Sequence, residues 1–175
     1  FNLNIVIDSD DSVFINSVNL VINILQDIIL HHDGFYDPSF NPQELITVKQ
    51  SDLSDNVMGI ANISTRTITL NINTDYTYTL LFDNYIAISN THAVVALHEL
   101  IHMLGFAISN TRFSANTSLI DNRLFYISAN SLNSYKNILE YNNYNSSNII
   151  GIPLENNFGN GTANSHFEEG LTNKT

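Results

Sequence analysis

The stretch HELIHMLGF, from His98 to Phe106, constrains this chain more than any other feature of its sequence. On an α-helix, residues four positions apart lie on one face with Cβ atoms about 6 Å apart, so His98 and His102 can direct ring nitrogens at one metal ion. Glu99 follows the first histidine and is placed to accept a proton from water without binding the metal itself. This spacing on an apolar helix rarely arises by chance, so it predicts a metal site.

Composition limits the ligands and partners that such a site can have. The 175 residues include no cysteine, so any metal must be held by His, Asp or Glu. The net charge of -11, with only six Lys and Arg, argues against nucleic acids and anionic membranes as partners. No run approaches the twenty or so apolar residues that a membrane span needs, so we expect no transmembrane segment.

The hydrophobic pattern predicts an α+β fold. Period-two alternation or short apolar runs predict strands that begin near Phe1, Glu44, Val57 and Thr67. The last of these, TITLNIN, has a polar face and is predicted to be an edge strand. Helical periodicity and capping residues predict three helices, which span Asp11 or Ser12 to Gly34, Thr91 to Gly105, and about Ser131 to Tyr141.

Catalytic zinc usually keeps three protein ligands and one open position, so a third ligand is needed beside the helix pair. His31 and His32 lie at the end of the first predicted helix, where a favourable interaction with the helix dipole is sufficient to explain their presence. His92 points to a different face of the motif helix, and Glu140 lacks an acidic partner four residues on. His166 lies in a glycine-rich segment, whose flexible backbone could bring a loop histidine to the helix pair.

HELIHMLGF together with IPLENNFGNGTANSHFEE resembles the leishmanolysin family of metzincin zinc peptidases. In that family the helix motif ends in Gly-Phe, and a third histidine arrives after a long insertion, inside a Gly-Thr…Ser-His-aromatic segment that follows a Pro-x-Glu-Asn phrase. The resemblance is strong over the motif helix and the tail. The first ninety or so residues match only in the order of strands and helices.

The resemblance implies a zinc-dependent metalloendopeptidase in which His98, His102 and His166 bind one catalytic Zn²⁺ and Glu99 is the catalytic carboxylate. It also implies a metzincin-like fold, with a twisted mixed sheet, two long helices, a smaller irregular C-terminal lobe and an active-site cleft between them. We expect residues 1–108 to form the first sub-domain and residues 109–175 to form the second, which supplies the third ligand.

Several expectations follow for partners and location. A peptide or protein substrate would lie extended along the edge strand, for which TITLNIN is our choice. The missing initiator Met and the resemblance favour a secreted or surface location. Family members have a methionine turn after the third histidine, whereas this chain has only Met58 and Met103, both earlier. Either the chain is a fragment cut before that turn, or the floor of its site is built differently.

Two other functions fit the same residues. The first is a non-catalytic module that zinc stabilises and that derives from a peptidase, in which Glu99 would have no role. The second is a zinc hydrolase that acts on something other than peptides. The sequence does not predict the substrate specificity, the oligomeric state, glycosylation or the biological role.

Overall fold

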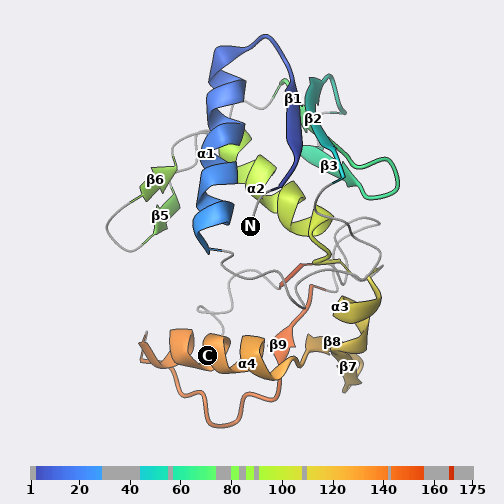
Figure 1. The fold of residues 1–175 in the computed structure, drawn as a ribbon. Coiled ribbons are helices and arrows are strands. Elements are labelled where there is room, and N and C mark those ends of the chain that lie inside the picture. The colour runs from blue at the N-terminus through green and yellow to red at the C-terminus, as the bar shows by residue number, and fades with distance from the viewer. Residues whose placement is uncertain are drawn as a thin grey trace. The chain divides into compact units, whose positions relative to one another are not determined.

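The computed structural model describes residues 3–28, 44–54, 57–73, 80–82, 86–88, 91–107, 110–141, 143–155 and 166–167. The chain divides into two compact units, Phe1–Leu104 and Gly105–Thr175. Figure 1 shows the helices and strands of both units in chain order.

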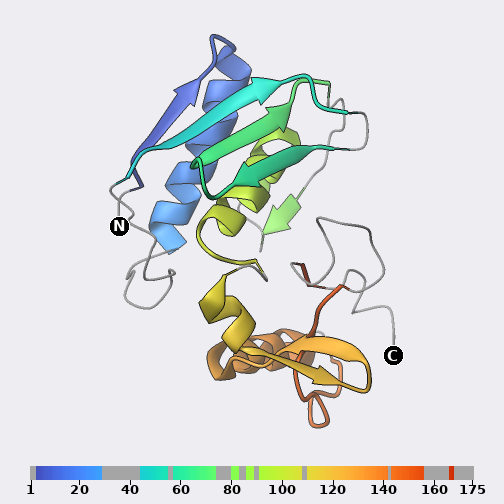
Figure 2. The ribbon, with the colours of Figure 1, turned by 90° about the vertical axis from the view of Figure 1, so that its right-hand side faces the viewer.

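The first unit is built on a mixed four-stranded sheet with the strand order β1-β2-β4-β3. The parallel neighbours are β1 (Ile5–Asp8), β2 (Ile46–Ser51) and β4 (Thr67–Asn71), and β3 (Gly59–Asn62) pairs antiparallel with β4. Helices α1 (Ser12–Ile28) and α2 (Thr91–Met103) cover one face of this sheet, as Figure 2 shows. A short antiparallel pair, β5 (Leu80–Phe82) and β6 (Ile86–Ile88), lies between β4 and α2 in the sequence. The predicted α+β class is confirmed.

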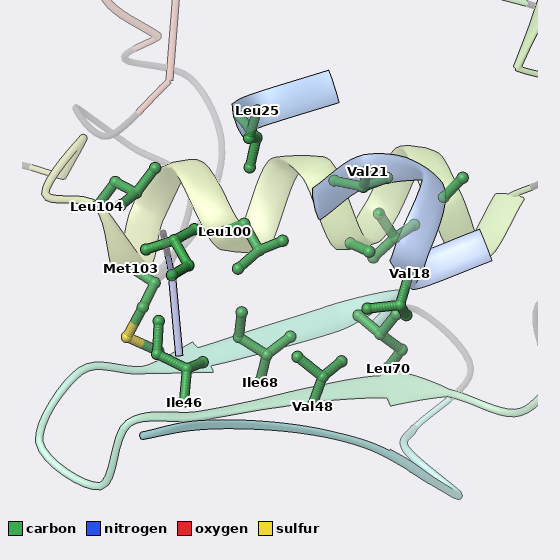
Figure 3. Packing of buried hydrophobic residues seen from close by; sticks show 14 of the residues in the cluster. Val18, Val21, Leu25, Ile46, Val48, Ile68, Leu70, Leu100, Met103 and Leu104 are labelled. Atoms are coloured by element: carbon green, nitrogen blue, oxygen red, sulfur yellow. The ribbon is translucent and has the colours of Figure 1, made fainter. Parts of the chain in front are cut away.

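The core of this unit lies between the helices and the sheet (Figure 3). Alternate residues of β2 and β4 are fully buried, which is what period-two patterning predicts for a sheet with one covered face. Each buried Leu, Ile or Phe side chain contributes about 1.5–3 kcal/mol of transfer free energy. This packing fixes the position of the helix that carries the histidines. The core members with no exposed surface are Phe14, Val18, Val21, Ile46, Val48, Ile68, Leu70, Ala93, Ala96 and Leu100.

Both long helices have the end signals that the sequence predicts. Asp11 caps α1, because its Oδ1 accepts hydrogen bonds from the backbone N–H groups of Val13 at 2.8 Å and Phe14 at 3.3 Å. Gly105 follows α2 with φ of 103°, a conformation that L side chains rarely adopt, so this glycine allows the chain to turn away from the helix. The predicted end of the first helix near Gly34 lies outside the described residues.

The prediction of an edge strand at TITLNIN is wrong. Strand β4, Thr67–Asn71, pairs with β2 on one side and with β3 on the other, so it is an inner strand. The described sheet has β1 and β3 at its two ends. Alternation of polar and apolar residues reports which face of a strand is covered, and it carries no information on which strand lies beside it.

The second unit contains a three-stranded antiparallel sheet in the order β7-β8-β9. Its elements are α3 (Thr111–Ala115), β7 (Thr117–Ile120), β8 (Arg123–Tyr126), α4 (Ala129–Tyr141) and β9 (Ile152–Pro153). The helix predicted near Ser131–Tyr141 is thus confirmed. The sheet was not predicted, because we expected an irregular lobe here. Asp121 and Asn122, with φ of 50° and 62°, form the two-residue turn between β7 and β8.

No helix in the described parts of the chain is both long enough and apolar enough to cross a bilayer.

Candidate metal centre

Helix α2 holds the motif because one of its faces is part of the core. Leu100 and Met103 are buried against the sheet, and Figure 3 shows both side chains above β2 and β4. The three motif residues have graded exposure: His98 is exposed, His102 is half-buried and Glu99 is buried. The apolar periodicity that forms the helix therefore also fixes the directions of the three chemical groups.

The two helix histidines point at each other. Their Nε2 atoms are 3.1 Å apart, and the rings are perpendicular, with centroids separated by 4.6 Å. Two nitrogen ligands at about 2.1 Å from a tetrahedral zinc ion are separated by about 3.4 Å. The observed pair is therefore within a few tenths of an ångström of the separation that one ion requires.

Glu99 lies in an apolar environment with only 7% of its surface exposed. Burial raises the pKa of its carboxyl group from 4.5 to about 7, although a hydrogen bond from the backbone N–H of Ala61 acts in the opposite direction. A carboxyl group with a pKa near 7 can both accept and donate a proton at neutral pH. Such a group beside two converging imidazoles is a candidate for acid–base chemistry.

Strand β3 approaches Glu99 closely, and Gly59 makes this approach possible. A Cβ atom at position 59 would lie 2.9 Å from Oε1 of Glu99 and 2.7 Å from Cγ1 of Val95. Both separations are shorter than real Cβ contacts, so a side chain here would displace the carboxylate or the strand. This role of Gly59 was not predicted, although a glycine inside a strand is a known sign of close backbone approach.

The raised pKa of Glu99 predicts a pH-dependent stability for the metal-free protein. Since the folded state retains a proton that the unfolded state releases above pH 4.5, the free energy of unfolding is expected to decrease as pH rises from about 4.5 to about 7. The total loss is at most about 3 kcal/mol. Glu99→Gln cannot ionise, so in chelator-treated samples its stability relative to wild type should be greater at pH 8 than at pH 4.5. Urea unfolding at both pH values measures the free energy of unfolding of each protein. The same difference between Glu99→Gln and wild type at pH 4.5 and at pH 8 would contradict the prediction.

His166 belongs to the second unit, where the chain after β9 holds it in place. The backbone N–H of Glu155 donates to the carbonyl oxygen of His166 at 2.9 Å, and Leu154 forms an antiparallel bridge with Phe167. The Phe167 ring packs edge-on against Phe106, with centroids 4.8 Å apart. His166 is half-buried, and its Nδ1 lies 3.8 Å from Oε2 of Glu155.

The other candidate ligands have different environments. His31 and His32 lie outside the described residues. His92, in the first turn of α2, packs edge-on against Phe14 at a centroid distance of 5.6 Å. The carboxylate of Glu140 accepts a hydrogen bond from the hydroxyl of Ser146, which ties the end of α4 to the following loop.

The two methionines belong to the hydrophobic core of the first unit. Met103 is almost fully buried there, and Met58 packs against the same core.

Comparison with protein-family models, with curated proteins and with solved structures gives no match for this chain. The assignment of function therefore depends on the residues themselves.

Proposed function

We propose that this chain is a zinc-dependent metalloendopeptidase, in which His98, His102 and His166 bind one zinc ion and Glu99 is the catalytic carboxylate. The observation that carries the proposal is local to α2: a buried carboxyl group, with a pKa of about 7, directly follows the first of two histidines whose Nε2 atoms lie 3.1 Å apart. A zinc ion with only a structural role would need the histidines and not this glutamate.

Two features support His166 as the third ligand. Like His98 and His102, it offers a ring nitrogen of the kind that zinc binds. Phe106, which follows His102 by four residues, contacts Phe167, the neighbour of His166. This aromatic contact ties the segment that follows the helix pair to the segment that carries the third imidazole.

The donor set fits zinc better than the other common divalent cations. Neutral imidazole is a normal zinc ligand, whereas magnesium and calcium prefer oxygen donors. Three protein ligands also leave the fourth tetrahedral position open, which is the arrangement of catalytic zinc sites.

In this proposal Glu99 carries the proton transfers. Zinc, when bound, supplies Lewis acidity toward a water molecule and toward the carbonyl oxygen of the scissile peptide bond. Glu99 takes a proton from the attacking water and later delivers it to the leaving amine, and its pKa near 7 suits both transfers. The Ala61 N–H group holds the carboxylate during these transfers, and burial limits its contact with bulk solvent.

The structure changes our choice of the strand that would bind the substrate. In place of TITLNIN, we propose that an extended peptide pairs with β3, which is at the end of the described sheet and approaches Glu99 through Gly59. Backbone pairing with this strand would bring a peptide carbonyl close to the catalytic carboxylate.

Metal removal tests the proposed activity. Treatment with a chelator is expected to abolish cleavage of an unfolded protein substrate, and one equivalent of Zn²⁺ should restore it where Mg²⁺ does not. Cleavage that persists in metal-free protein would contradict the proposal. A fully zinc-loaded chain that cleaves no unfolded protein would instead support a zinc-stabilised module or a hydrolase with a different substrate.

A further inference from the structure

The segments around Glu155 and His166 are paired like two short antiparallel strands. Leu154 forms a bridge with Phe167, and the Glu155 N–H donates to the His166 carbonyl at 2.9 Å. In this register Glu155 and His166 are directly opposite each other, and opposite residues in an antiparallel pair have their side chains on the same face. Leu154 is fully buried and anchors the first segment. The backbone therefore sets the carboxylate beside the imidazole.

The two side chains are well shielded from solvent. The Glu155 carboxylate is 13% exposed and the His166 ring 18% exposed, and Oε2 lies 3.8 Å from Nδ1. This separation is longer than a hydrogen bond, and the side chains would have to move closer by about 1 Å to form one of about 2.8 Å. Because the pair is largely buried, screening by water and salt is weak.

We propose that Glu155 is a positioning residue for the metal centre, an inference that rests on the proposed function. Its carboxylate accepts a hydrogen bond from Nδ1–H of His166, which fixes the tautomer and the ring orientation, so that Nε2 is the ring nitrogen that would bind zinc. Metal-binding histidines almost always donate their second ring N–H in this way, and such partners raise the basicity of the ligand. The helix pair also converges through its Nε2 atoms, so the three ligands would use the same ring position.

Zinc affinity tests the inference in the full 175-residue chain. Competition with a chromophoric chelator is expected to show about 10–100-fold weaker zinc binding for Glu155→Ala, and a smaller loss for Glu155→Gln, whose amide oxygen can still accept from Nδ1–H. Glu140→Gln, a substitution in the same unit and remote in sequence, should bind zinc with wild-type affinity.

A second measurement separates positioning from general support of the fold. In zinc-loaded protein, nitrogen-15 NMR of the His166 ring should show a slowly exchanging Nδ1–H in wild type and in Glu155→Gln, and fast exchange in Glu155→Ala. The inference is overturned if Nδ1–H stays protected in Glu155→Ala, or if the Ala and Gln variants lose affinity equally.

The same titrations distinguish failure of this inference from failure of the proposed function. If His166→Ala weakens zinc binding and Glu155→Ala does not, the inference is wrong and the ligand set stands. If His166→Ala leaves the affinity unchanged, the ligand set is wrong and the role of Glu155 fails with it.

Discussion

Glu99→Gln is expected to lower kcat for peptide cleavage by about 10²–10⁴-fold, the usual contribution of a general base, while the zinc content stays at one ion per chain. The substitution keeps the size of the side chain and an oxygen that can accept the hydrogen bond from Ala61 N–H. It removes only the ability to take up and return a proton. Initial rates and metal content, measured on the same preparation, test both parts of the expectation.

Glu44→Gln is the matched control, since it neutralises a carboxylate that is 54% exposed and pairs with Arg66 on the surface. Its kcat should equal that of wild type. Equal cleavage by Glu99→Gln and wild type would remove Glu99 from the mechanism. Loss of zinc from Glu99→Gln would mean that this carboxylate supports metal binding and not proton transfer.

His98→Ala and His102→Ala are each expected to weaken zinc binding by on the order of 1,000-fold, since a direct ligand is worth more than the 10–100-fold of an outer partner. The two Nε2 atoms already have nearly the separation that two ligands of one ion need. Each ring would therefore supply one ligand, and the remaining ring cannot supply both. Competition titrations with a chelator measure these affinities.

His92→Ala is the control for the helix pair. It removes an imidazole from the same helix, but this ring packs against Phe14. Its zinc affinity should therefore match that of wild type. A similar loss of affinity for all three histidine variants would show that damage to the helix, and not loss of a ligand, weakens binding.

The sequence predicted the helix that carries the site well because the signals are local. The periodic apolar residues, the spacing of His98 and His102, and Gly105 at the helix end all act within about one or two turns. The start of the first helix at Asp11 or Ser12 was predicted for the same reason, and Asp11 is the residue that caps it. Such features depend only on neighbours along the chain.

The features that the sequence did not predict depend on residues that are distant in the chain. The raised pKa of Glu99 results from burial beneath β3, in which Gly59 is forty residues earlier, and no pattern near Glu99 contains this information. The inner position of β4 depends on pairing with β2 and β3. The sheet of the second unit consists of strands of two to four residues, which are too short for a clear alternation, although the Asp121-Asn122 turn was a usable sign.

His166 is also a long-range prediction, since it lies sixty-four positions after His102 in the sequence. The most direct measurement is therefore a zinc titration of His166→Ala beside wild type at neutral pH. The proposal predicts one tight site in wild type and an affinity weaker by on the order of 1,000-fold in the variant, comparable to the loss in His98→Ala. Unchanged tight binding by His166→Ala would contradict the three-histidine centre.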